Sequence, residues 1–195
     1  MCIVILLYYI FNGYKTTKIL YNIGMNKIIT SSKRLVIVHM TNDMAYDIWQ
    51  NSLDEDNRRF VPDEVFETLE DAKEVIEQII SCYQSEDGPF IYAILRKNDN
   101  ANIGYVQLVK IDEGWEIGYH IAKIYTGNNY ATEALLAFLD YLKTSTDLKE
   151  VFGVALFTNV ASRRVLQKCG FEVFFEGVGM YQGRKRKIIK SIKKL

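Results

Sequence analysis

The stretch from Trp115 to Ala134, WEIGYHIAKIYTGNNYATEA, decides the fold of this chain. It begins as an alternating run typical of a strand and passes into a short loop that contains Gly127 and two asparagines. A helix N-terminus follows, with unpaired N–H groups and the positive end of the helix dipole. This succession predicts a site for an anionic group such as a pyrophosphate. The alternative is a plain strand-to-helix connection capped by Asn128 or Asn129.

The rest of the chain extends this unit into a layered fold. Apolar residues at helical spacing and alternating β-branched runs give the other elements. The segment 53–62 reads as a loop or an irregular helix. The predicted order is β-α-α-β-β-β-α-β-α-β-β, a single α/β (α+β) domain with a mixed, mostly antiparallel sheet flanked by helices. We expect strands over 34–40, 90–96, 103–111, 115–121, 151–157, 171–181 and 186–192, and helices over 44–52, 69–83, 129–144 and 159–169.

Length and composition indicate one compact domain. The chain has 195 residues, of which 49% are apolar and 25% charged, with 24 basic and 24 acidic side chains. This balance argues against a nucleic-acid-binding protein. The only basic concentration runs from Arg184 to Lys194 and alternates with isoleucines. It reads first as a solvated edge strand with a tail, and second as a patch for an anionic partner.

Cysteines and histidines give no pattern for a metal or for a nucleophile. Cys2, Cys82 and Cys169 are far apart, and His39 and His120 are the only histidines. No spacing suits zinc, so we expect no metal cofactor. A Cys/His hydrolase is equally disfavoured. Unpaired thiols fit a reducing compartment, so we expect a cytoplasmic protein.

The N-terminus reads as an extension outside the domain. The apolar run from Cys2 to Phe11 is about half the length that spans a bilayer, and it lacks the flanks of a signal peptide. Met25 opens a stretch that resembles a natural start. We therefore expect residues 1–24 to be a non-core extension and 25–195 to be the domain, with no stable membrane insertion. The alternative is a membrane-associating segment.

Two motifs resemble the GNAT superfamily of acetyl-CoA-dependent N-acetyltransferases, in particular the ribosomal-protein alanine N-acetyltransferase branch. The first is Glu116-Ile-Gly-Tyr119 followed by Gly127-Asn-Asn-Tyr-Ala-Thr-Glu-Ala134. The second is Asn159-Val-Ala-Ser-Arg-Arg-Val-Leu-Gln-Lys-Cys-Gly-Phe171, which matches its family pattern throughout. The resemblance covers residues 33–193 by element order and is motif-specific from Glu116 to Phe171.

The resemblance implies a pyrophosphate-binding loop made of Gly127, Asn128, Asn129, Tyr130 and Ala131, acting through backbone N–H groups. One departure lies inside it, because Asn129 replaces a family glycine. Asparagine tolerates left-handed backbone better than most residues. Either the loop keeps its shape at a modest cost, or it binds coenzyme A more weakly.

The resemblance also implies roles for four residues outside the loop. Ile121 would lie on the strand that pairs with the pantetheine arm, and Asn159 would hydrogen-bond the cosubstrate or simply cap its helix. Ser162 would protonate the leaving thiolate or be a small residue in the first helical turn. Glu116 would be the general base, through water, or an outward-facing strand carboxylate.

Two further motif residues are expected to be structural. Glu133 lies in the first turn of its helix, where a carboxylate favours the helix dipole. Cys169 follows its helix, where nothing lowers the pKa of its thiol, so it is expected to pack in the core.

The implied function is transfer of an acetyl group from acetyl-CoA to a primary amine by direct attack. The acceptor would be a small-molecule amine or a protein N-terminus, and a homodimer is possible. Positioning supplies much of the rate in such a reaction, so a nucleophile is not required. The alternative is a catalytically weak or inactive acyl-CoA-binding sensor, for which the Asn129 replacement is the motive.

Overall fold

The computed structural model describes residues 27–195, and the expected extension over residues 1–24 lies outside the described residues. One mixed sheet runs through the molecule, in the order β1-β2-β3-β4-β5-β6-β8-β7. All pairings in it are antiparallel except the one between β5 and β6. The predicted fold class is therefore confirmed. The strands are β1 (Ile28–Ser31), β2 (Leu35–His39), β3 (Phe90–Arg96), β4 (Asn102–Ile111), β5 (Gly114–Ile121), β6 (Glu150–Leu156), β7 (Glu172–Tyr181) and β8 (Arg184–Lys194).

The predicted helices are present, and the structure adds two short elements. The strand β1 extends the sheet beyond β2, and the helix α3 lies in the segment that we expected to be a loop or an irregular helix. Asp54 caps α3 by accepting a hydrogen bond from the backbone N–H of Asn57. The helices are α2 (Ala45–Ser52), α3 (Glu55–Phe60), α4 (Leu69–Cys82), α5 (Tyr130–Ser145) and α6 (Val160–Lys168), with 3-10 turns η1 (Asn42–Met44), η2 (Pro62–Glu64) and η3 (Lys123–Tyr125).

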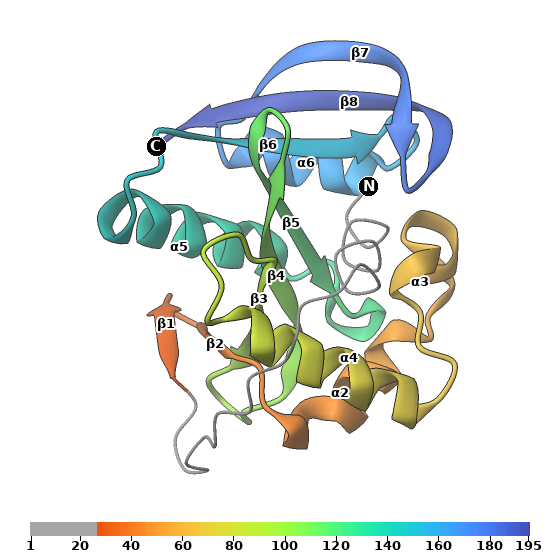
Figure 1. Cartoon of the computed structure of the whole chain (residues 1–195), viewed down its shortest axis with the longest axis vertical. Helices are drawn as coiled ribbons and strands as arrows, with labels where there is room; N and C mark the ends of the chain where they lie inside the picture. The colour runs from red at the N-terminus through yellow and green to blue at the C-terminus, as the bar shows by residue number, and fades with distance from the viewer. Residues whose placement is uncertain (1–26) are drawn as a thin grey trace.

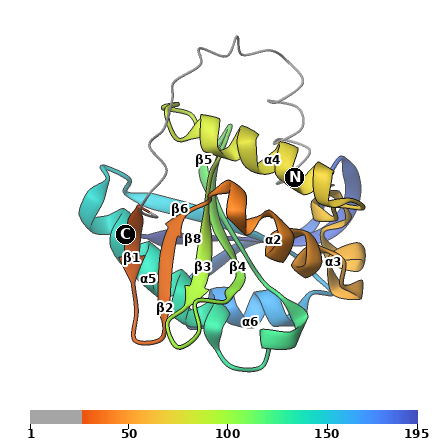
Figure 2. The ribbon, with the colours of Figure 1, turned by 90° about the horizontal axis from the view of Figure 1, so that it is seen from below.

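Helices cover both faces of the sheet. Figure 2 shows α4 and α2 on one side of the central strands, and α5 and α6 on the other. Each side has its own apolar core, because alternate residues of a strand face opposite sides. Leu35 and Ile37 of β2 pack with Phe138 of α5, whereas Val38 packs with Ile76 of α4. The sheet is thus the middle layer of a three-layer domain.

The sheet opens between β5 and β6. Their parallel pairing is limited to one Cα pair, Glu116 with Phe152. Beyond this pair, the edge of β5 from Ile117 to Ile121 has no strand partner on the β6 side among the described residues. Figure 1 shows β6, β8 and β7 together at one end of the molecule and β1 with β2 at the other. The opening therefore lies between two parts of the sheet.

Local sequence signals explain the ends of the elements beside this opening. Asn159 caps α6, as predicted, by accepting a hydrogen bond from the backbone N–H of Ser162. Gly170 follows α6 with φ +77°, the left-handed conformation that we expected there. The β7–β8 turn is at Gln182 and Gly183, as predicted, with φ values of +48° and +68°.

Candidate active site

A cavity of about 230 Å³ occupies the opening between β5 and β6. Its wall comes from β5, the start of α6, Ala131 in the first turn of α5, and α3 with η2, with further residues from β4, β6 and β7. Five of the nine site residues expected from the sequence line it, and Gly127, Asn128, Asn129 and Tyr130 form the loop at its edge. The five are Glu116, Ile121, Ala131, Asn159 and Ser162.

Glu116 lies at the narrow end of the opening. It is the β5 residue that pairs with Phe152, and its side chain is only 5% exposed. The alternative of an outward-facing strand carboxylate therefore does not hold. A buried carboxyl group that lines the cavity is in a position to accept a proton from a group bound there.

Tyr119 and Ser162 join β5 to α6 across the cavity. The Tyr119 hydroxyl donates to the Ser162 carbonyl oxygen at 2.8 Å, and it lies 3.0 Å from Ser162 Oγ. Burial raises the pKa of Tyr119 above its usual value, so its phenol stays protonated at neutral pH. With its own proton donated to the carbonyl oxygen, the Tyr119 hydroxyl can accept from Ser162 Oγ, so the contact positions the Ser162 hydroxyl beside β5.

Asn159 already has one hydrogen bond within the protein. Its Oδ1 accepts from the backbone N–H of Ser162 at 3.1 Å, so the residue is a helix cap. Capping uses the side-chain oxygen and leaves the amide Nδ2 available on the cavity side. A cap and a ligand contact are thus compatible in one residue.

The loop before α5 keeps a regular left-handed bend despite the Asn129 replacement. Asn129 has φ +64° and ψ +12°, and Gly127 has φ +80°. Asn128 holds the loop by donating from Nδ2 to the carbonyl oxygens of Tyr125 and Thr126, both at 3.1 Å. Asn129 thus adopts the left-handed backbone that a glycine would allow, and its effect on coenzyme A binding stays a prediction.

The space around this loop is open to a ligand. A Cβ added at Gly127 would have no other atom within 4 Å. Within residues 27–195, no hydrogen-bond acceptor is found for the backbone N–H groups of Tyr130, Ala131 and Thr132, and Asn129 makes no side-chain cap. The loop therefore presents unpaired donors beside unfilled space.

Side chains from two other elements fix the loop. Lys168 of α6 donates to Asn129 Oδ1 at 2.9 Å. Arg34 donates to the Asn128 carbonyl oxygen at 3.0 Å and pairs with Glu133 at 2.6 Å. Burial alone would raise the pKa of Glu133, but hydrogen bonds from Ser32 and Arg34 outweigh it, and the pKa is lowered. Glu133 thus joins the start of α5 to the β1–β2 turn, in a structural role as expected.

Cys169 is likewise structural. It is 3% exposed within the main core, and burial raises the pKa of its thiol to about 11. Its thiol therefore stays protonated at neutral pH, as expected for a cysteine that packs.

The opposite wall of the cavity contains a buried acid that the sequence did not indicate. Glu64 of η2 is 5% exposed, and its Oε2 has no hydrogen-bond partner among the described residues. Burial raises the pKa of Glu64 to about 8. Burial also lowers the pKa of His120, on β5, to about 4, so its imidazole is neutral at pH 7.

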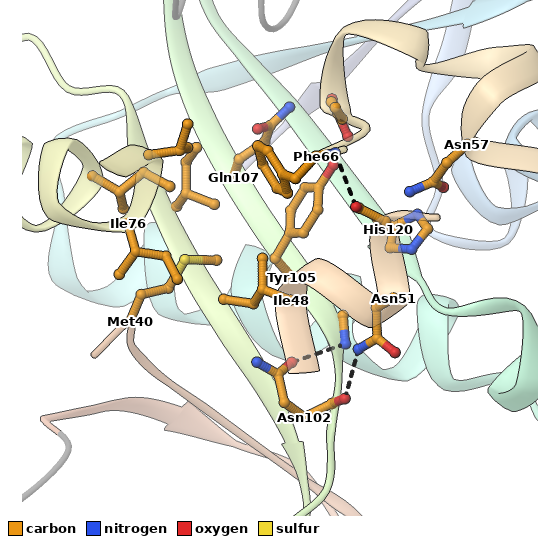
Figure 3. A pocket seen from close by; sticks show the side chains of 16 residues that line it. Met40, Ile48, Asn51, Asn57, Phe66, Ile76, Asn102, Tyr105, Gln107 and His120 are labelled. Carbon is orange, nitrogen blue, oxygen red and sulfur yellow. Dashed lines mark hydrogen bonds between the residues drawn. The ribbon is translucent and has the colours of Figure 1, made fainter. Parts of the chain in front are cut away.

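Behind this wall lies a smaller, apolar cavity of about 50 Å³ (Figure 3). Asn57, Glu64, Tyr105, Gln107 and His120 line both cavities. Figure 3 shows Ile48, Ile76 and Met40 on the apolar side, and His120 with Asn57 on the other. The two cavities therefore share a polar wall.

Most of the residues that sequence reasoning missed come from outside the motifs. Tyr119 is the last residue of the motif Glu116-Ile-Gly-Tyr119, so this motif could have indicated Tyr119 as a site residue. Glu64, Asn57 and Tyr181 carry no such pattern. They reach the cavity only because α3, η2 and the β7–β8 hairpin fold toward β5.

Residues 27–195 contain neither a membrane-spanning helix nor a cluster of metal-ligating side chains. None of the helices there is both long and apolar enough to cross a bilayer. No group of three or more His, Cys, Asp or Glu side chains in the same range could hold a metal ion.

The chain is similar to known acetyltransferases in sequence and in structure. It is 26% identical to the uncharacterized N-acetyltransferase YoaA of Bacillus subtilis (strain 168) over 147 residues, which are 74% of this chain and 82% of YoaA. Its fold matches RimL, a ribosomal L7/L12 alpha-N-protein acetyltransferase solved with coenzyme A, with a TM-score of 0.74 and 17% identity over 87% of this chain and 98% of that one.

A second solved structure with the same fold is an immunity acetyltransferase. It is the microcin C7 self immunity acetyltransferase MccE in complex with acetyl-CoA and AMP, with a TM-score of 0.72 and 16% identity over 84% of this chain and 94% of that one. A family model described as acetyltransferase (GNAT) domain matches residues 34–172, which is most of the chain. The chain therefore belongs to the GNAT acetyltransferase family.

Proposed function

We propose that this protein is an N-acetyltransferase that uses acetyl-CoA to acetylate a primary amine. One observation carries the proposal. Glu116 and the Tyr119–Ser162 hydroxyl pair line the same cavity, at the point where the sheet opens. A proton acceptor and a proton donor in one cavity are what the transfer of an acyl group from a thiol to an amine requires.

The residues around the opening fit acetyl-CoA as the cosubstrate. The loop from Gly127 to Ala131 would hold its pyrophosphate, because the unpaired N–H groups and the positive end of α5 favour negative charge. The open edge of β5 up to Ile121 would pair with the amide groups of the pantetheine arm. Asn159 would donate from Nδ2 while its Oδ1 caps α6.

The chemistry then needs only proton transfers from this chain. The amine nitrogen attacks the thioester carbonyl carbon, the new C–N bond forms and the C–S bond breaks. Glu116 takes the proton that the amine loses, directly or through a water. Ser162, held by its contact with the Tyr119 hydroxyl, would give its hydroxyl proton to the leaving sulfur, and it would regain a proton from solvent as Glu116 releases the one taken from the amine. Glu116 and Ser162 would thus act as the general base and the general acid. In enzymes, a general acid or base raises the reaction rate by about 10²- to 10⁴-fold.

The acceptor would be a small-molecule amine or a protein N-terminus. The similarity to RimL, an alpha-N-protein acetyltransferase, supports a protein N-terminus as one candidate. The homodimer expected from the sequence stays a prediction.

Free-thiol release from acetyl-CoA tests the proposal. Purified full-length protein should release coenzyme A when amino acids, alkyl amines or N-terminal peptides are supplied, and mass spectrometry should find the acetylated amine. Calorimetry with acetyl-CoA separates binding from turnover.

The outcomes distinguish the proposal from its alternative. Binding of acetyl-CoA without turnover of any amine would support the acyl-CoA-binding sensor instead. If acetyl-CoA neither binds nor raises the melting temperature, both functions are excluded.

A further inference from the structure

A second cavity, of about 360 Å³, adjoins the candidate active site. It lies between α3 with η2 and the turn of the β7–β8 hairpin, and Figures 1 and 2 both show α3 beside the turn end of this hairpin. Phe60 and Tyr181 line both cavities. We call this second space the hairpin cavity. A ligand of moderate length could occupy both spaces at once.

Basic side chains dominate the hairpin cavity. Arg59, Arg184, Arg186 and Lys187 line it, with Asp63 as the only acidic residue in its lining. Lys187 pairs with Glu176 at 2.9 Å. Arg59, Arg184 and Arg186 form no ion pair with any carboxylate in residues 27–195. The cavity therefore has excess positive charge on three guanidinium groups, which suit carboxylate and phosphate oxygens.

A buried amide in the same lining also lacks a partner. Gln182 lies in the hairpin turn and is 9% exposed, and its Nε2 has no hydrogen-bond acceptor among the described residues. A buried donor left without a partner costs about 1–3 kcal/mol. An anionic ligand in this cavity would offer acceptor oxygens to this donor and to the guanidinium groups that share the lining.

The candidate active site has the opposite charge. Its lining includes the carboxyl groups of Glu116 and Asp54, while Glu64 is kept protonated by burial and Asp56 is paired with Lys123. The two adjoining cavities therefore present acidic groups on one side of Phe60 and Tyr181 and basic groups on the other. Such a separation suits a ligand with charges of both signs.

We propose that the acceptor is a primary amine with an anionic group, a carboxylate or a phosphate ester, which the hairpin cavity binds while the amine enters the active site. This inference rests on the proposed acetyltransferase function. Arg184 and Arg186 are the specificity-determining residues, because both line the hairpin cavity and neither forms an ion pair within residues 27–195. Lys185 lies between them on β8 and is not among the residues that line the cavity.

Matched pairs of acceptors test the proposal. Each pair holds one ω-amino acid and its amide, or one aminoalkyl phosphate and its amino alcohol, over a series of spacer lengths. At the best spacer, the wild-type protein should give a kcat/KM at least about tenfold higher for the anionic member. The carboxylate and phosphate arms then tell which anion is preferred. Added salt should reduce the preference.

Three variants locate the effect. Arg184→Gln and Arg186→Gln should each raise KM for the anionic acceptor about fivefold to tenfold, leave its kcat within twofold and leave the neutral acceptor unaffected. The matched control, Lys185→Gln, removes the same charge from the same strand and should change neither acceptor by more than about twofold.

Three results would overturn the proposal. They are equal kcat/KM for both members of every pair, equal effects of Arg186→Gln and Lys185→Gln, and a rise in KM for acetyl-CoA in place of the acceptor. Should a variant fail to fold, the wild-type preference alone decides.

Calorimetry measures binding of the acceptor without turnover, so it tests this inference separately from the proposed acetyltransferase function. If no amine is acetylated, the proposed function fails. The inference then stands only if the wild-type protein binds the anionic amine at least about tenfold more tightly than its neutral twin.

Discussion

Glu64 makes the stability of the protein depend on pH in a calculable way. Its carboxyl has a pKa of about 8 in the folded chain, raised by burial, against 4.5 when solvated. Below pH 4.5 both states hold the proton and there is no penalty. Between pH 4.5 and 8 the unfolded chain releases a proton that the folded chain keeps, so stability falls as the pH rises. Each pH unit in this window costs about 1.4 kcal/mol.

The Glu64→Gln variant removes this dependence. From pH 5.5 to pH 7.0 the penalty on the wild-type protein grows by about 2 kcal/mol. The variant should therefore gain about 2 kcal/mol relative to wild type over the same interval, or about 4–8 °C in melting temperature. The buried amide has its own cost, but that cost is the same at both pH values.

Urea unfolding of both proteins at the two pH values measures the difference. Glu77→Gln is the matched control, because Glu77 is exposed on α4 and the substitution is identical. The control should change the free energy of unfolding by no more than about 0.5 kcal/mol at either pH. If Glu64→Gln and Glu77→Gln respond to pH alike, the carboxyl of Glu64 is not held protonated by burial and the reasoning is refuted.

Three further predictions concern the reaction and its loop. Glu116→Gln should lower kcat by about a hundredfold or more in a steady-state assay with little change in melting temperature; an unchanged kcat would place the base elsewhere. Tyr119→Phe and Ser162→Ala should each lower kcat, and the double variant should lose little beyond the worse single one, because the hydroxyls act as a pair; losses that multiply would contradict this. Gly127→Ala should destabilise by about 1 kcal/mol and raise KM for acetyl-CoA, and Gly127→Asn should recover part of both, since asparagine tolerates positive φ. If the two variants are equally impaired, the backbone argument is wrong.

The parts of the fold that could be predicted are those with local causes. The cap at Asn159, the left-handed Gly170 and the turn at Gln182–Gly183 each follow from a residue's own conformational preference, and all three are present. The strand β1 was not predicted, because Ile28–Ser31 is short and gains its order from pairing with β2. Helix α3 is six residues long and strongly charged, so its sequence could not decide between the loop and the irregular helix that were both expected there.

The same limit applies to the candidate site. The two motifs mark the strand β5 and the starts of the helices α5 and α6. The site residues within the motifs lie on these elements, so the sequence could predict that they face one site. Glu64 and Tyr181 enter the cavity from segments that lie about 50 to 60 residues from β5 along the chain. Nothing local distinguishes a buried glutamate in η2 from the exposed ones nearby, such as Glu67, because burial is decided by packing.

The limited pairing of β5 with β6 links ligand binding to the cohesion of the whole sheet. One registered Cα pair joins the strands from β1 to β5 to those from β6 to β8, and the ion pair between Lys190 and Glu113 adds a contact beside it. A molecule that hydrogen-bonds along the open edge of β5 would act as a missing strand between the two parts. Its binding free energy would then add to the free energy of unfolding. Amide hydrogens from Ile117 to Ile121 would exchange more slowly with solvent as the cosubstrate concentration rises, so the cosubstrate would be a structural component of the sheet as well as a reactant.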